Sequence, residues 1–281
     1  MAVGYEAGQS NQQQRCVAIG FQAGQTDQAD SNGGSVAIGY QSGRVSQGAG
    51  NVAIGLGSGE FDQDFSSVAV GEECGRYNQS SLSVAMGSFA GYTGQGSQSV
   101  AIGRQSGRET QAANAVAIGE SSAQYTQGTN SVAVGTNAGQ YSQGTNSVAI
   151  GFDAGNTGTQ GDDCVAIGTN AGRISQADEC VAIGREAGES NQATQSVAIG
   201  VRCGEDTQGT QSVAIGFECG RTTQGANSVA IGFESGEAIQ AARSVAIGYQ
   251  AGQTQQFNDS VAIGYVAGSQ DQNENCVAIR S

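Results

Sequence analysis

The sequence contains no proline and no histidine, and its 11 basic residues are all arginines. Without histidine or lysine, a general base would have to be a carboxylate or a thiolate, and no acidic position recurs to build a paired carboxylate site. The net charge is −14 and no basic stripe balances it, which argues against nucleic acid as a partner. We therefore expect no enzymatic activity, no cofactor and no nucleic acid ligand.

Cysteine is scarce, with seven residues and no Cys-x-x-Cys pair, so the sequence indicates no metal cluster. Each cysteine stands where alanine, serine or asparagine stands elsewhere, which favours a packing role. Cys164 and Cys180, like Cys203 and Cys219, are one repeat apart. In a stack of repeats their Cα atoms would lie about 4.8 Å apart, although parallel side chains suit a disulfide poorly.

Glycine is abundant, with 46 residues, and one motif recurs from end to end. A typical copy is Ser147-Val148-Ala149-Ile150-Gly151. With its valine as position 1, the repeat reads Val-Ala-Ile-Gly-x-x-(Ala/Ser/Cys)-Gly-x-x-x-Gln-x-x-x-(Ser/Cys). The interval is 16 residues, except for insertions near 30–34 and 158–161, which lengthen it to 19 and 17. Insertions confined to one part of the repeat are typical of loops on one side of a stacked coil.

The glycines argue against a helix, because each would destabilise it by roughly 1 kcal/mol relative to alanine. Short strands that turn at glycine fit better, and coils stacked about 4.8 Å apart would pair each strand with its copies above and below. We predict an all-β fold, a parallel β-solenoid or β-roll of about 17 coils, as one domain over residues 1–281. At that spacing the rod would be about 80 Å long. Val and Ile at positions 1 and 3 share one side of the strand, and we expect them to form the core.

Glycine at positions 4 and 8 is almost invariant, and it is replaced only at Arg280 and Ala123. We expect both rows to lie where φ is positive or where backbones approach closely. The absence of proline fits a stack in which each amide N–H bonds to a neighbouring coil.

Glutamine at position 12 is the most regular polar residue. Stacked amides can each donate to and accept from the next, so we predict a structural ladder that closes a turn, with a ligand-reading row as the alternative. The ladder residues are Gln12, Gln28, Gln47, Gln63, Gln79, Gln95, Gln111, Gln127, Gln143, Gln176, Gln192, Gln208, Gln224, Gln240, Gln256 and Gln272. In the 17-residue repeat, Thr159 holds position 12 and Gln160 follows it.

Alanine at position 2 never varies, and it faces away from Val and Ile. Such strictness predicts close packing on this side, against another part of the same coil or against another copy of the chain. We favour another copy, because a strip of small residues along a rod is a ready interface. The candidate interface residues are Ala2, Ala18, Ala37, Ala53, Ala149, Ala262 and Ala278.

The variable positions support stacking in register. Opposite charges would meet on consecutive coils, as in the runs Glu186, Arg202, Glu218 at position 6 and Glu205, Arg221, Glu237 at position 9. Each such exposed pair is worth about 0.2–1 kcal/mol. Aromatic residues gather at position 5 toward both ends of the sequence and at position 10 in its middle. They either cover the coil corner, which we favour, or form a strip for sugars or another subunit.

The runs at 130–135, 146–151 and 227–232, each Asn-Ser-Val-Ala-(Ile/Val)-Gly, resemble the head repeat of the YadA-like trimeric autotransporter adhesins. The resemblance implies a parallel β-roll, three chains packed side by side with the small-residue face at or near the contact, extracellular display and adhesion. The repeat here is somewhat longer than the family's usual unit, and it adds the glutamine at position 12.

Three functions stay open. The leading prediction is a structural rod, extracellular or at the cell surface, that self-associates into filaments through uncapped ends and the alanine face. The alternatives are a trimeric adhesin head that binds a surface glycan or protein, and a protein that binds ice or a crystal surface. The threonines at position 10 that would serve the last role are interrupted by Val, Phe, Tyr and Ile. The repeat starts at Met1 and no apolar run is long enough to span a membrane, so we expect no membrane insertion. The abrupt ends fit either a fragment of a longer protein or copies that join end to end.

Overall fold

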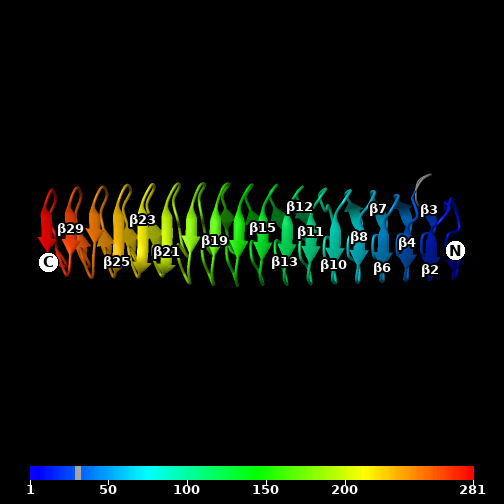
Figure 1. The fold of residues 1–281 in the computed structure, drawn as a ribbon, viewed down its shortest axis with the longest axis horizontal. Coiled ribbons are helices and arrows are strands. Elements are labelled where there is room, and N and C mark those ends of the chain that lie inside the picture. The colour runs from blue at the N-terminus through cyan, green and yellow to red at the C-terminus, as the bar shows by residue number, and fades with distance from the viewer. Residues whose placement is uncertain (29–32) are drawn as a thin grey trace. The chain divides into compact units, whose positions relative to one another are not determined.

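The computed structural model describes residues 1–28 and 33–281, and in these ranges it holds strands and turns but no helix, hence none that could cross a membrane. The chain divides into two compact units, an N-terminal unit Met1–Tyr141 and a C-terminal unit Ser142–Ser281. Within each unit, the strand arrows follow one another in chain order (Figure 1). The predicted parallel β-solenoid is confirmed, with about 17 turns about 16 residues apart. That residues 1–281 form a single domain stays a prediction.

Positions 1–3 of each repeat form the main strand of a coil. In the N-terminal unit these strands are β1 (Ala2–Val3), β2 (Val17–Ile19), β4 (Val36–Ile38), β6 (Val52–Ile54), β8 (Val68–Val70), β10 (Val84–Met86), β11 (Val100–Ile102), β13 (Val116–Ile118) and β15 (Val132–Val134). In the C-terminal unit they are β17 (Val148–Ile150), β19 (Val165–Ile167), β20 (Val181–Ile183), β21 (Val197–Val201), β23 (Val213–Phe217), β25 (Val229–Phe233), β27 (Val245–Ile247), β29 (Val261–Gly264) and β30 (Val277–Arg280).

Each main strand pairs in parallel with its neighbours in the same unit, and the register places every residue beside its counterpart one repeat away. Between β11 and β13, for example, Val100 faces Val116, Ala101 faces Ala117 and Ile102 faces Ile118. The repeat period is therefore also the sheet register, and each position of the motif forms a straight column along the unit.

A second, shorter strand ends at position 12. In the N-terminal unit these are β3 (Thr26–Gln28), β5 (Val45–Gln47), β7 (Phe61–Gln63), β9 (Tyr77–Gln79), β12 (Thr110–Gln111) and β14 (Thr126–Gln127). In the C-terminal unit they are β16 (Ser142–Gln143), β18 (Thr159–Gln160), β22 (Thr207–Gln208), β24 (Thr223–Gln224), β26 (Ile239–Gln240) and β28 (Gln255–Gln256).

The two glycine rows behave as predicted, each for its own reason. At position 4 the φ angles lie between 113° and 139°. A Cβ on Gly119 would lie 2.5 Å from the carbonyl oxygen of Gly135 in the next coil. At position 8 the φ angle is near 50°, and a Cβ on Gly107 would lie 3.1 Å from the amide of Gln111. Glycine is thus required at position 4 by the neighbouring coil and at position 8 by the glutamine of its own coil.

The prediction that Val and Ile form the core is wrong. Ile102 and Ile118 are each 37% exposed, whereas alanine at position 2 is fully buried from Ala18 to Ala262. Among the described residues, most buried side chains stand at positions 2, 7, 12 and 16, and the largest fully buried side chains are glutamines. A branched side chain does not fit there, since even a Cβ on Gly59 would lie 3.2 Å from that of Ala53. The narrow cross-section of the coil turns the larger apolar residues outward.

The two insertions differ in what can be described. Residues 30–32 of the first insertion lie outside the described residues. In the second, Ser142 pairs with Thr159 and Gln143 with Gln160, so the additional residue is accommodated before β18, where Gly158 has a φ of 142°. Gln160, and not Thr159, therefore takes the position of the buried glutamine in this coil.

Candidate functional site

The position-12 glutamines are joined side chain to side chain inside the coils. Nε2 of Gln79 donates to Oε1 of Gln95 at 3.0 Å and to the carbonyl oxygen of Val68 at 3.0 Å, while its Oε1 accepts from Gln63 at 2.9 Å. The same amide link, at 2.9–3.2 Å, runs without interruption from Gln12 to Gln127 and from Gln208 to Gln272. These amides are bonded to one another and to backbone, which favours the structural alternative over a row that reads a ligand.

The C-terminal unit contains two interruptions of this ladder. Oε1 of Gln160 and Oε1 of Gln208 are buried and accept no hydrogen bond within the described part of the chain. At the second interruption, Nε2 of Gln192 donates instead to the carbonyl oxygens of Val181 and Ser196. Each unpaired buried oxygen costs about 1–3 kcal/mol, so these two coils are local weak points of the stack.

The alanines predicted as an interface lie on the inner side of the sheet. Ala18, Ala37, Ala53, Ala149 and Ala262 have no exposed surface, because they pack against position 7 and the glutamine of their own stack. Serine at position 7 reinforces this contact, as when Oγ of Ser106 donates to the carbonyl oxygen of Ala117 at 2.7 Å. Of the candidate residues, only Ala2 and Ala278 in the end coils keep exposed surface. The strictness of alanine thus reflects packing within the coil, the alternative that we did not favour.

The outer side of the main sheet carries an extensive apolar surface. Valine at position 1 is half-buried along both units, and the exposed position-3 residues include Ile54, Met86, Ile102, Ile118, Ile150 and Ile263, each 37–41% exposed. Positions 1 and 3 point the same way because side chains alternate along a strand, and position 5 follows them where the strand continues past the glycine, in β21, β23 and β25. The glycine at position 4 has a similar φ in the other coils, so position 5 repeats this placement there. Three parallel columns therefore cover this side of each unit, which we call the outer face.

Aromatic rings at position 5 form stacked ladders on the outer face. One is Tyr5–Phe21–Tyr40, with ring centroids 5.2 and 5.0 Å apart, and the other is Phe217–Phe233–Tyr249–Tyr265, with centroids 5.0–5.2 Å apart. Neighbouring ring planes lie within 14° of parallel, so each ring face lies against the next ring and mainly edges meet solvent. Sugars stack on ring faces, so this geometry favours contact with an apolar surface over sugar binding.

Charged side chains form ladders at positions 6 and 9. Arg202 bridges Glu186 at 2.7 Å and Glu218 at 3.4 Å, as the register prediction requires. Arg221 lies 3.0 Å from Glu237 and 3.2 Å from Glu218. These pairs place an arginine between the carboxylates of consecutive coils.

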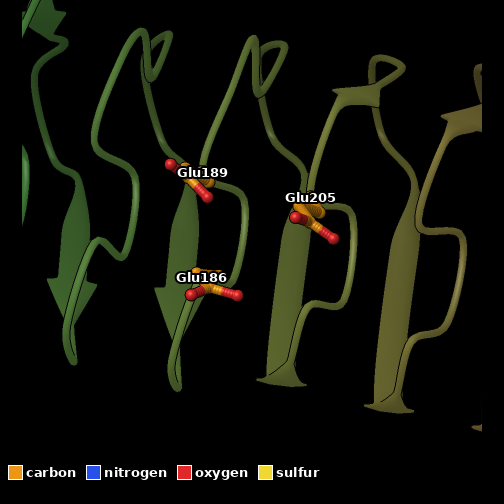
Figure 2. A group of neighbouring side chains, drawn as sticks. All are labelled: Glu186, Glu189 and Glu205. Atoms are coloured by element: carbon orange, nitrogen blue, oxygen red, sulfur yellow. The ribbon is translucent and has the colours of Figure 1, made fainter.

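One acidic group departs from this alternation. Figure 2 shows Glu186 and Glu189 on one coil and Glu205 on the next, and an oxygen of each lies within 4.8 Å of the others. Arg202 lies 2.7 Å from the carboxylate of Glu186, and Arg173 lies 2.7 Å from that of Glu189. Burial raises the pKa of Glu205, and the neighbouring acids add to the shift. The arrangement could hold a cation only in competition with the two arginines.

Six of the seven cysteines are buried, and Cys276 is exposed. Burial raises the pKa of the Cys74 thiol to about 11, which makes that thiol unreactive at neutral pH. The hydrogen bond between the thiols of Cys164 and Cys180, together with burial, raises the pKa of Cys164. Both pairs of stacked cysteines are reduced thiols that fill the coil interior, in line with the packing role.

A polar groove of about 690 Å³ runs beside β3, β5, β7 and β9 in the N-terminal unit. Position 11 forms one wall, with Asn11, Asp27, Ser46, Asp62 and Asn78 at φ angles of 52–56°. At one end of this wall, Asn11 donates to Asp27 at 2.7 Å. Among the described residues no apolar side chain lines the groove, which suits a hydrophilic ligand.

Comparison with known families agrees with the sequence resemblance. Residues 111–138 match two copies of the YadA head domain repeat. The match begins at the last residue of β12 and covers β13, β14 and β15. The in-register stacking of these coils extends to the neighbouring repeats of the same unit. The chain therefore carries YadA-like head repeats in a β-solenoid. No curated protein matches the sequence.

Proposed function

We propose that this chain is a non-enzymatic, adhesin-type head module that is displayed at the cell surface and associates side by side with copies of itself through the outer face. The observation that carries the proposal is the continuous double column of Val and Ile side chains outside the coils. Exposed apolar surface that runs along a whole unit is typical of protein contacts in soluble proteins. The YadA head resemblance supports association as a homo-oligomer, with three copies as the expected number.

A second copy of the chain is the partner that fits this surface. The columns repeat at the strand spacing of about 4.8 Å over many coils. A partner of different architecture would match that spacing only locally, whereas another copy matches it at every coil. Side-by-side packing would bury the isoleucines that the coil interior is too narrow to accept.

Light scattering after size-exclusion chromatography tests the proposal. The variant Ile102→Thr/Ile118→Thr keeps β-branched residues but removes apolar surface from the outer face. We expect the dissociation constant of the oligomer to rise by about tenfold for each substitution, the factor that about 1.4 kcal/mol produces. The matched control is Ile239→Thr, which alters an isoleucine that is 47% exposed in β26, away from the outer face.

Circular dichroism must show that all variants keep the β-solenoid. An oligomer that the outer-face variant does not weaken, or a wild-type chain that stays monomeric at every concentration, would refute the proposal. Electron microscopy of the same samples tests the filament prediction, because end-to-end joining would give particles much longer than a single chain.

The polar groove favours a second function, the binding of a hydrophilic surface ligand such as a glycan. Its walls offer amide, hydroxyl and carboxylate groups, including Asp62 and Asp64, that hydrogen-bond to sugar hydroxyls. A glycan array with the wild-type chain and with Asp62→Asn/Asp64→Asn tests this function. Signal that is lost in the variant would support binding in the groove, and an array without signal, or with equal signal for both proteins, would exclude it. Binding to ice stays a prediction.

A further inference from the structure

The position-5 column differs from the other two columns of the outer face because its chemistry changes along each unit. Position 1 is valine in every coil of the C-terminal unit, and position 3 is isoleucine in every coil. If two copies slide past each other by one coil, these columns meet the same residue types again. Valine and isoleucine therefore hold copies together but do not select the axial register between them.

Position 5 carries the information that the other columns lack. In the N-terminal unit it reads Tyr5, Phe21, Tyr40, Leu56, Glu72, Ser88, Arg104, Glu120 and Thr136. In the C-terminal unit it reads Phe152, Thr169, Arg185, Val201, Phe217, Phe233, Tyr249, Tyr265 and Ser281. Each unit thus has a block of consecutive apolar coils and a block that contains charged side chains.

The apolar blocks are also rigid and accessible. Phe217 and Phe233 are each 38% exposed, and they continue strands β23 and β25 in line with the valine and isoleucine of those strands. Stacking on their neighbours restricts the ring orientations, so little conformational entropy remains to be lost in a contact. The ladder is therefore a preformed apolar edge.

The charged blocks oppose misalignment. Arg104 and Glu120 are ion-paired, and their side chains are 57% and 50% exposed. A shifted copy would press aromatic rings against these charges and remove them from water, which is unfavourable unless they find new partners. An antiparallel copy of the N-terminal unit would likewise bring Phe21 and Tyr40 to the heights of Glu120 and Arg104.

We propose that the position-5 column sets the axial register and the parallel orientation of side-by-side copies, with each aromatic ladder placed at the height of the same ladder in its neighbour. This inference rests on the proposed self-association through the outer face. It assigns adhesion between copies to Val and Ile, and alignment to the residues two positions further along the strand.

The absence of lysine provides a specific assay. The substitution Arg185→Lys introduces one side-chain amine at position 5 while keeping the charge of an exposed arginine. In register, this lysine lies at the same height in every copy, so a short amine cross-linker joins copies into covalent dimers. The chain without lysine measures the background from the terminal amine.

The test compares cross-linking in two backgrounds. Phe217→Thr/Phe233→Thr/Tyr249→Thr removes the ladder, whereas Tyr125→Thr/Tyr141→Thr removes a stacked pair at position 10, whose rings are 5.2 Å apart. Without the ladder, copies should populate several axial registers about equally, and only one of these registers brings the lysines together. The cross-linked fraction should therefore fall about threefold. The control should leave that fraction unchanged. If the triple variant does not assemble, the single variant Phe233→Thr replaces it, and its cross-linking yield is compared with that of the wild type in the same way.

The two proposals fail in different ways. A wild-type chain that does not oligomerise in light scattering refutes the proposed self-association itself. A ladder variant that oligomerises and still cross-links as efficiently as the wild type refutes the register assignment and leaves self-association standing. A loss of yield in the position-10 control would also overturn the assignment, because register would then depend on aromatic stacking anywhere on the coil.

Discussion

Replacing Gln79 with methionine, its closest apolar isostere, tests whether the buried amides stabilise the coils by supplying one another's hydrogen bonds. The substitution removes three hydrogen bonds of 2.9–3.0 Å and leaves Oε1 of Gln95 without its donor. A buried polar atom without a partner costs about 1–3 kcal/mol, and Gln63 and Val68 each lose one bond, so the free energy of unfolding should fall by about 3–5 kcal/mol.

A block substitution makes the test sharper. When Gln63, Gln79 and Gln95 all become methionine, the links inside the block disappear on both sides, and only Gln47 and Gln111 lose a ladder partner that leaves a glutamine behind. The carbonyl oxygens of Val52, Val68 and Val84 each lose a donor as well. The cost should therefore stay below about twice that of the single variant, a strong departure from additivity.

Urea unfolding followed by circular dichroism measures these costs, and hydrogen exchange shows whether the loss of stability is confined to the neighbouring coils. The control Gln14→Met changes an exposed glutamine and should shift the free energy of unfolding by less than about 0.5 kcal/mol. A block variant that costs three times the single variant would show that each amide acts independently, and the reasoning would be refuted.

Three further predictions concern glycine, charge and thiols. Gly119→Ala should lower the free energy of unfolding in urea by more than about 3 kcal/mol, because a Cβ there would clash with the next coil. In the control Gly94→Ala the new Cβ meets nothing closer than 3.4 Å, so the cost should be only the roughly 1–2 kcal/mol of an alanine in the left-handed conformation. Equal costs for the two variants would contradict the steric argument. Burial raises the pKa of Glu205 in the folded state above its unfolded value, so the folded protein binds more protons and gains stability as pH falls through that pKa. Calorimetry should accordingly show that Glu205→Gln raises the melting temperature at pH 7 and not at acidic pH. The control Glu237→Gln loses an ion pair and should not raise the melting temperature. A lower melting temperature for Glu205→Gln at pH 7 would refute this reasoning. With a thiol reagent at pH 8, Cys276 should react quickly and the six buried cysteines only after unfolding; several fast thiols would mean that the coils open readily.

The repeat period, the strands and both glycine rows could be predicted from the sequence, because each is a property of a single coil or of its nearest neighbour. The side of the sheet that faces inward could not. Alternation shows that Ala149 and Ile150 point in opposite directions, and by hydrophobicity alone the larger apolar side chain is the expected core residue. The cross-section of a 16-residue coil decides otherwise, and only the closed structure reveals it.

One signal in the sequence does point to the inner side. Position 2 never departs from alanine, whereas position 3 accepts valine at Val70 and methionine at Met86. A site that accepts side chains of different size has free space beside it, and a site that accepts one size has none. The polar groove left no comparable signal, because it depends on the left-handed backbone of position-11 residues on consecutive coils, such as Ser46 and Asp62.

The uniform interior of the coils has a consequence for how such a chain can evolve. Every regular coil offers the same alanine, small residue and glutamine to the coil above as to the coil below, so a coil that is duplicated or deleted leaves no mismatch at the junction. Length can then change by recombination within the gene without any compensating substitution in the interior. The outer face does not share this freedom, because each added coil shifts the order of side chains at position 5 and would change which copies recognise one another.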